Sequence, residues 1–239
     1  MKKFDHDITC VILGARGFIG TEVSKIANEK FKNVIRVDLE NSDLNIDMVN
    51  NINNFFDQLD YMGENLYIIN LIALNPKVET LNKYNSSDYN KYKSFMKFNI
   101  DYPVLLTTKL VEFAKHNMHK RIDLCLMGSI YANTFANKNQ YPGMQSKDLG
   151  YIVSKHGLSG LIRGMKSQYL PENFRINMIN PGAVENTEMP DFFKDSFVKI
   201  SGGKLNSVSD VSEFICNLGF AYESLYSCSI IDITGGAIA

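Results

Sequence analysis

Six apolar runs alternate with helical stretches along most of this chain, and this alternation constrains its fold more than any other feature. Runs of this length that are separated by helices are typical of βαβ units with right-handed crossovers. The chain has 239 residues, enough for one such domain and too few for two comfortable ones. We therefore predict a single α/β domain with a doubly wound parallel sheet. The expected strands cover residues 8–13, 33–38, 66–72, 121–128, 174–180 and 229–234.

A glycine-rich loop follows the first run and opens an amphipathic stretch. Gly14 permits a tight turn, Gly17 lets the backbone approach a pyrophosphate, and Gly20 lets the helix pack on the strand. The helix N-terminus offers free N–H groups to the phosphates. For the triplet alone, a structural glycine turn is the alternative. In this context it predicts an NAD(P)-binding Rossmann-type domain over residues 1–239. The expected cofactor loop contains Gly14, Arg16, Gly17, Phe18, Ile19 and Gly20.

The second run ends in Asp38. A carboxylate there can accept both ribose hydroxyls and repels a 2′-phosphate, which favours NAD over NADP. Arg16 points mildly the other way, because it could pair with a phosphate, and we weigh Asp38 more heavily. Leu39 is expected beside the cofactor. Asp47 is placed to face the adenine, although a surface turn residue would need no function there. No crossover helix fits between Asp38 and Leu44, so we expect a trimmed adenosine side.

Tyr151 and Lys155 lie four residues apart, so on a helix they project from one face, one turn apart. The ammonium can then lower the pKa of the phenol towards neutrality, and such a phenol can pass a proton to or from a substrate oxygen. Ser129 follows the fourth run, at the strand end where open α/β sheets bind ligands. The alternatives are a solvated lysine beside a half-buried tyrosine and a strand-capping serine. Together the three residues favour catalysis.

Two helical stretches, 92–117 and 148–170, complete the pattern. Asn99 lies in the first, near Pro103, and a kink there could free a backbone carbonyl for water. The second carries glycines at spacings of three and four. Because glycine destabilises a helix, this stripe suggests close approach of another backbone, in a subunit interface or in tight internal packing. The stripe consists of Gly157, Gly160 and Gly164.

Composition narrows the classes of partner. The 25 basic and 26 acidic side chains nearly cancel, so nothing points to a nucleic acid or a membrane surface. No apolar stretch approaches a membrane span, and no signal-peptide core follows the first residues. His116 and His119 sit one helical turn apart without a third ligand, so no metal is expected. We expect buried free thiols in a reducing cytoplasm for the four scattered cysteines, Cys10, Cys125, Cys216 and Cys228.

These motifs follow the order found in the short-chain dehydrogenase/reductases, which the chain resembles over nearly its whole length. The resemblance implies a catalytic tetrad of Asn99, Ser129, Tyr151 and Lys155. In it, Tyr151 is the general acid/base, and Lys155 lowers its pKa and holds the nicotinamide ribose. Residues 70–73 resemble the segment beside the adenosine ribose, and 177–182 resemble the Pro-Gly turn behind the nicotinamide. The further cofactor contacts that it implies are Ala73, Pro181, Gly182, Val184 and Thr187.

Some features depart from the family pattern. The glycine spacing is that of the extended subfamily, yet the ending leaves no separate substrate domain. Thr187, the threonine expected to hold the nicotinamide carboxamide, comes one residue later than in the family pattern. Ser129 lies 22 residues before Tyr151, and residues 128–131 with this longer loop are similar to a bacterial subgroup associated with unusual sugars for flagellar or surface glycans. Residues 187–207, which carry several aromatic side chains, are expected to form a small substrate lid, although a plain amphipathic core helix fits nearly as well.

The leading expectation is a cytoplasmic NAD(P)-dependent oxidoreductase, with NAD preferred, that acts on a secondary alcohol or ketone. The substrate is expected to be a small molecule such as a sugar or sugar nucleotide of bacterial glycan biosynthesis, with no nucleic acid or membrane partner. The alternatives are a nucleotide-sugar epimerase or dehydratase with retained NAD and a non-catalytic dinucleotide-binding protein. The resemblance also implies a homodimer or homotetramer.

Overall fold

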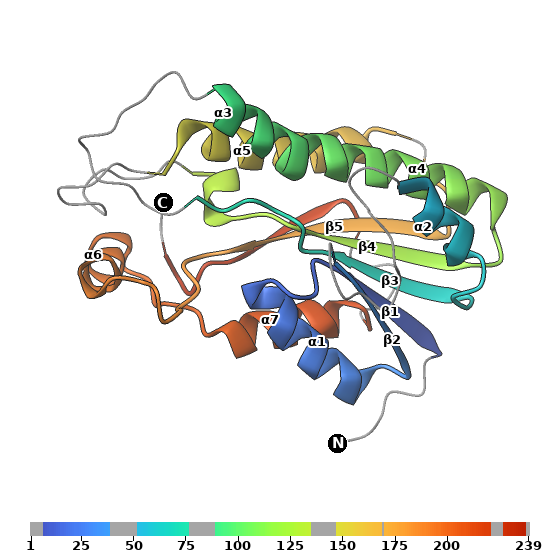
Figure 1. Cartoon of the computed structure of the whole chain (residues 1–239), viewed down its shortest axis with the longest axis horizontal. Helices are drawn as coiled ribbons and strands as arrows, with labels where there is room; N and C mark the ends of the chain where they lie inside the picture. Colours follow the sequence, from blue (N-terminus) through green and yellow to red (C-terminus); the bar gives the residue numbers. More distant parts are fainter. Residues whose placement is uncertain are drawn as a thin grey trace.

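A six-stranded, all-parallel sheet in the order β2-β1-β3-β4-β5-β6 forms the middle layer of the protein (Figure 1). The computed structural model describes residues 7–38, 52–76, 89–134, 147–168, 170–220 and 227–237. All six predicted strands are present, so the predicted single-domain, doubly wound α/β class is confirmed. The strands are β1 (Ile8–Leu13), β2 (Asn33–Val37), β3 (Asn65–Asn70), β4 (Arg121–Met127), β5 (Phe174–Pro181) and β6 (Ser229–Ile233).

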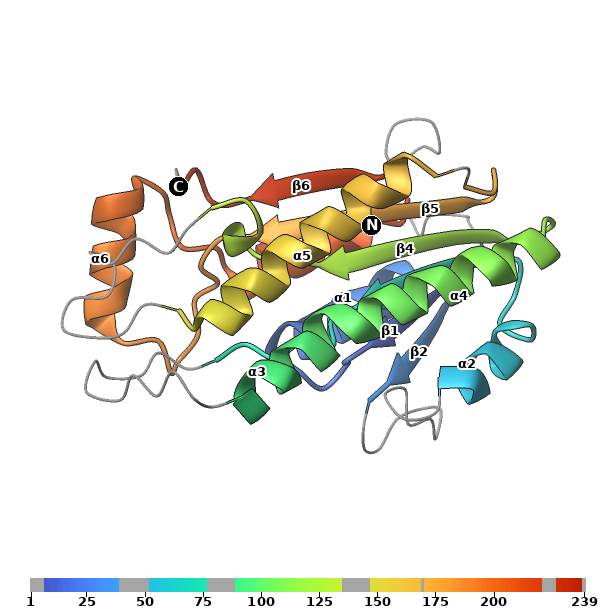
Figure 2. The same cartoon turned by 90° about the horizontal axis from the view of Figure 1, so that it is seen from above.

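Helices cover both faces of the sheet (Figure 1). One face carries α3 (Tyr89–Met96), α4 (Tyr102–His116) and α5 (Leu149–Lys166), and the other carries α1 (Phe18–Lys30) and α7 (Val208–Leu218). Helix α6 (Asp191–Ser201) stands apart, beyond the carboxyl ends of the strands (Figure 2). None of the helices in the described ranges is long and apolar enough to cross a membrane.

A further helix, α2 (Ile52–Leu59), lies in the connection between β2 and β3. It packs against α4, where the rings of Phe56 and Phe113 lie 6.2 Å apart. The expectation of a trimmed connection was therefore wrong. The crossover helix simply begins later in the chain than the Asp38–Leu44 interval that suggested its absence.

The core consists of two apolar clusters, one on each face of the sheet. Because side chains alternate along a strand, Val11 and Leu13 face α4, whereas Cys10 and Ile12 face α1 and α7. The four cysteines are free thiols. Three of them are buried together in the second cluster and the fourth is half-buried, so the expectation of buried thiols is confirmed for Cys10, Cys125 and Cys216.

The predicted helix of 92–117 is interrupted. A single π-helical turn, Lys97–Asp101, joins α3 to α4 and contains the buried side chain of Asn99. π-Helical turns of this kind insert one extra residue and are frequent at functional sites. The irregularity expected at Asn99 is thus present, although Pro103 itself fits into the first turn of α4.

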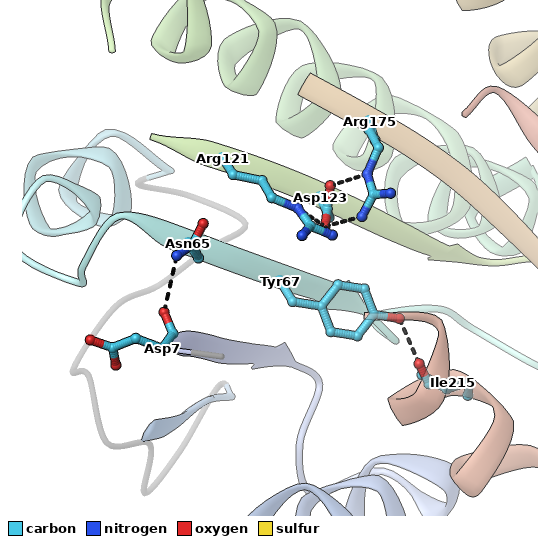
Figure 3. A network of polar contacts seen from close by, with 7 residues as sticks. All are labelled: Asp7, Asn65, Tyr67, Arg121, Asp123, Arg175 and Ile215. Carbon is cyan, nitrogen blue, oxygen red and sulfur yellow. Dashed lines mark hydrogen bonds and ion pairs between the residues drawn. The ribbon is translucent and has the colours of Figure 1, made fainter. Parts of the chain in front are cut away.

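A buried polar cluster ties the strands together away from their carboxyl ends (Figure 3). Asp123 on β4 accepts a bidentate pair of hydrogen bonds from Arg175 on β5. It also accepts from Arg121, at 2.9 Å from Nε and 2.6 Å from Nη2. On the same face, the Tyr67 hydroxyl donates to the backbone carbonyl of Ile215 on α7 at 2.6 Å. The Asp123–Arg175 pair thus ties β4 to β5, and the Tyr67 hydroxyl ties β3 to α7.

We predict that Asp123→Ala lowers the free energy of unfolding by about 3–5 kcal/mol, because it leaves two guanidinium groups without their buried carboxylate. Chemical denaturation measures this change. The control is Glu22→Ala, which removes an exposed ion pair with Lys25 and should change stability by about 0–1 kcal/mol. An equally small loss for Asp123→Ala would show that the cluster does not hold the strands.

Candidate active site

A cavity of about 820 Å³ lies where the loops leave the carboxyl ends of the parallel strands. Figure 2 shows the strand arrows pointing towards this end of the molecule and α6 standing beyond them. The walls come from the loops after β1, β3, β4 and β5, from the start of α5, and from α6. Segments far apart in the sequence therefore meet at one site, as expected for an open parallel sheet.

The glycine loop forms one wall of the cavity. Gly14 has a positive φ of 81°, and a Cβ at this position would lie 3.0 Å from the backbone of Leu71 and Ile72. A Cβ on Gly20 would lie 2.1 Å from the carbonyl oxygen of Gly14, so only glycine lets α1 start so close to β1. Helix α1 has no acidic residue in its first turn, and Gly17 provides no side-chain cap. Its first N–H groups are thus available to an anion.

Asp38 holds this loop from the end of β2. Its carboxylate accepts a hydrogen bond of 2.7 Å from the backbone N–H of Arg16. The backbone N–H of Gly14 donates to the carbonyl of Val37 at 2.8 Å. The carboxylate predicted to meet the adenosine ribose thus lies directly beside the phosphate loop, although neither Asp38 nor Arg16 lines the cavity itself.

Tyr151, Lys155 and Ser129 form the opposite wall. Tyr151 and Lys155 lie one turn apart on α5, and both are buried. The Lys155 ammonium donates to the carbonyl of Met127 at 3.0 Å and lies 5.7 Å from the centre of the Tyr151 ring. The Ser129 hydroxyl accepts from the backbone N–H of Tyr131 at 3.3 Å, and its interaction with the Tyr151 phenol lowers the pKa of that phenol. The backbone N–H of Ser129 donates to Asn180 Oδ1 at 3.2 Å, which ties the serine loop to β5.

The pKa of the phenol differs from the sequence-based expectation. Burial raises the pKa of Tyr151 to about 12, the hydrogen bond with Ser129 lowers it, and the nearby Tyr131 raises it. The Lys155 ammonium does not contribute, because it is directed at the Met127 carbonyl, and burial lowers its own pKa to about 8. The prediction that Lys155 moves the Tyr151 pKa towards neutrality was therefore wrong for this arrangement, because burial dominates the pKa of the phenol.

Asn99 lies behind this wall rather than in the cavity lining. Its amide oxygen accepts from the backbone N–H of Leu74 at 2.8 Å. Its amide nitrogen donates to the Leu74 carbonyl at 3.1 Å and to Ser154 Oγ at 3.0 Å. Ser154 in turn donates to the carbonyl of Tyr151 at 2.7 Å. Asn99 thus connects the π-helical turn, the loop after β3 and the tyrosine helix.

The structure brings most of the predicted site residues together. Thr187 is exposed and, like Asn99, Arg16 and Asp38, lies outside the cavity lining. Leu39 and Asp47 lie outside the described residues. The predicted residues that line the cavity are Gly14, Gly17, Phe18, Ile19, Gly20, Ala73, Ser129, Tyr151, Lys155, Pro181, Gly182 and Val184.

Sequence reasoning missed several cavity residues, among them Asn75, Tyr131 and Lys147. Lys147 precedes Tyr151 by four residues but lies just ahead of α5, so helical spacing does not mark it in the sequence. Asn75 and Tyr131 follow β3 and β4 without any local pattern that marks them. No group of three potential metal ligands occurs within the described ranges.

The donor set fits a nicotinamide dinucleotide. The glycine loop and the uncapped start of α1 match a pyrophosphate, and Asp38 stands next to them. A Cβ on Gly182 would lie 2.6 Å from the carbonyl oxygen of Thr234, so Pro181 and Gly182 pass tightly against the end of β6. Such a fixed turn can serve as the flat back wall for a nicotinamide ring.

Comparison with known proteins agrees with this geometry. The family model described as Enoyl-(Acyl carrier protein) reductase matches residues 3–218. Cyclohexanol dehydrogenase from Acinetobacter sp. (strain SE19) is 29% identical over 70 residues, which cover 29% of this chain and 28% of that enzyme. The match therefore spans less than a third of this relative.

Two solved structures share the fold. One is a short chain dehydrogenase from Leptospira borgpetersenii serovar Hardjo-bovis (strain JB197) with bound NAD+, with a TM-score of 0.79, 18% identity, and coverage of 97% of this chain and 92% of that chain. The other is ElxO with NADP bound, with a TM-score of 0.74, 15% identity, and coverage of 97% and 98%.

The family match covers most of the chain, and the shared fold covers nearly all of it. The glycine loop and the grouped Ser129, Tyr151 and Lys155 stand where that fold binds its ligands. The chain therefore belongs to the short-chain dehydrogenase/reductase family of NAD(P)-dependent oxidoreductases.

Proposed function

We propose that this protein is an NAD-dependent oxidoreductase that interconverts a secondary alcohol and a ketone. The observation that carries the proposal is the grouping of Ser129, Tyr151 and Lys155 on one wall of the cavity whose other wall is the glycine loop. A protein that only bound a dinucleotide would need none of these three side chains. Their burial keeps water away from the place where a proton would move.

In the proposed mechanism, Ser129 and the Tyr151 hydroxyl bind the carbonyl oxygen of the ketone. With a pKa of about 12, Tyr151 is protonated near neutral pH, which is the form that donates a proton to that oxygen. Bound NADH would supply the hydride to the carbonyl carbon. Lys155 would hold the nicotinamide ribose. Asn99 would act as a positioning residue, through Ser154 and the loop after β3.

We further propose that residues 187–207 form a lid over the substrate. Support comes from α6, since Phe192, Phe193 and Phe197 line the cavity. Phe197 is buried, whereas Phe192 is 40% exposed. A lining that combines these aromatic side chains with polar groups such as Asn75 and Asn186 suits a carbohydrate-sized substrate, and this supports a sugar or sugar nucleotide as the alcohol.

A dimer or tetramer completes the proposal. On α5, a Cβ on Gly160 or Gly164 would meet nothing within 4 Å among the described residues, so packing against that part of the chain does not explain these two glycines. Leu149 and Val153 continue the same side of the helix and are 62% and 51% exposed. Exposed side chains on α4 such as Leu105, at 43%, add apolar area for a second copy.

The first prediction concerns catalysis. Tyr151→Phe removes only the proton-donating hydroxyl, so turnover should fall by about 10²–10⁴-fold while NADH binding stays intact. NADH absorbance with a panel of ketones and sugars measures turnover, and NADH fluorescence measures binding. Tyr102→Phe is the matched control, because it removes a buried hydroxyl that has no hydrogen-bond partner in the described part of the chain and lies outside the cavity. Near-normal turnover by the Tyr151→Phe variant would refute the mechanism.

The second prediction concerns the cofactor. Asp38 should make NAD(H) bind more tightly than NADP(H), and Asp38→Asn should narrow the difference because it removes the charge that repels a 2′-phosphate. Asparagine keeps an oxygen for the Arg16 N–H, so the loop should retain its shape, whereas Asp38→Ala should also weaken binding of both cofactors. Fluorescence titration gives the affinities. Equal or reversed affinities in the wild-type protein would mean that Arg16 decides the preference.

The third prediction concerns assembly. Gly160→Leu should weaken the oligomer, because a large side chain would separate two closely packed helices at a cost of about 1–3 kcal/mol. Light scattering measures the mass in solution. Lys166→Leu is the control, since it adds the same side chain at an exposed position of α5 outside the stripe. A wild-type mass of 27.0 kDa at working concentration would contradict the proposed assembly.

A further inference from the structure

A second lysine stands beside the proposed proton donor. Lys147 lies four residues before Tyr151, just ahead of the start of α5, and Lys155 lies four residues after it within the helix, so the two lysines flank the tyrosine in the sequence. The Lys147 ammonium is 5.4 Å from the centre of the Tyr151 ring, and that of Lys155 is 5.7 Å away. Both lysines line the cavity. The mechanism above gives a role to Lys155 and leaves Lys147 unexplained.

The partners of Lys147 are neutral. Its ammonium donates to Asn75 Oδ1 at 2.8 Å and to the carbonyl of Pro76 at 2.9 Å. An ammonium has three donors, so one donor remains for another acceptor. Among the described residues no carboxylate pairs with it, whereas the nearby Lys91 pairs with Asp148 and Lys194 pairs with Glu185. Burial without a compensating anion lowers the pKa of Lys147 to about 8.

A purely structural role does not account for this arrangement. A neutral amide could connect Asn75 and Pro76 without the cost of removing a charge from water. Lys147 instead places a partly dehydrated cation in the wall of a cavity, next to the side chain proposed to transfer the proton. A cation in such a place is stabilised when a ligand brings an opposite charge, and the charge-assisted hydrogen bond formed is stronger than one to a neutral group.

We propose that Lys147 binds an anionic group of the substrate, either a carboxylate or a phosphate ester, close to the carbon that is oxidised or reduced. This inference rests on the proposed function, because it places the reacting carbon at Tyr151. Lys155 is less suited to this task, since its ammonium is already directed at the Met127 carbonyl. The site thus selects an acidic alcohol, and a neutral alcohol of the same shape leaves the Lys147 charge without a partner.

The test compares matched pairs of small probes on the protein saturated with NADH. Lactate is compared with isopropanol, which has a methyl group in place of the carboxylate, and glycerol phosphate is compared with glycerol. Binding is followed by the change in NADH fluorescence. A charge-assisted hydrogen bond contributes enough for the anionic member of at least one pair to bind about tenfold more tightly. The pair with the larger ratio identifies the carboxylate or the phosphate as the preferred group.

Three variants connect the preference to Lys147. Lys147→Gln keeps donors for the Asn75 and Pro76 oxygens but removes the charge, so it should abolish the preference. Lys147→Arg should retain most of it, whereas a merely structural role would be preserved at least as well by glutamine. Lys166→Gln removes a charge from the far end of α5 and should leave the preference unchanged.

Each outcome decides the matter. Equal binding within both pairs in the wild-type protein, or an undiminished preference in Lys147→Gln, overturns the inference. If NADH binds normally in either case, the proposed oxidoreductase function stands and only the role of Lys147 falls. If NADH does not bind to the wild-type protein, the proposed function falls and this inference falls with it.

Discussion

The site depends on the parallel pairing of β1, β3, β4 and β5, because that pairing brings the loop after each strand to the same edge of the sheet. Gly14 follows β1, Ser129 follows β4 and Gly182 follows β5. None of these residues contacts the cavity through a long side chain, so their positions are set by the strand register itself. The buried carboxylate of Asp123 and its two arginines secure that register at a distance from the chemistry.

Burial of the ionisable side chains is the second feature that determines the chemistry of the site. Burial raises the pKa of Tyr151 and lowers those of Lys147 and Lys155, so all three groups move towards their neutral forms. The two lysines differ in their surroundings: one is directed at a backbone carbonyl, and the other stands among neutral oxygens in the cavity wall. Their different environments give two equally spaced lysines different proposed roles.

Much of this arrangement could be predicted from the sequence. The strands were predictable because a strand buried on both faces is an uninterrupted apolar run, and the cofactor loop because its glycines have a fixed spacing. The raised pKa of Tyr151 could not be predicted, because the burial of its side chain depends on residues that are distant in the sequence. Asn75 and Asn180 were missed for the same reason: their partners, Lys147 and Ser129, are more than fifty residues away.

Helices α3 and α4 are consecutive in the chain, and the π-helical turn Lys97–Asp101 between them makes the two helices present different faces to the rest of the protein. Before the turn, Phe95 packs edge-on against Tyr151, with their ring centres 6.2 Å apart, whereas after it Leu106 and Leu110 enter the core over the sheet. One residue corresponds to a rotation of roughly 100° in an α-helix. Loss of a single residue from this turn would therefore swing Phe95 away from the tyrosine while leaving the core contacts in place. Natural variation must therefore preserve the length of this turn as well as the side chain of Asn99.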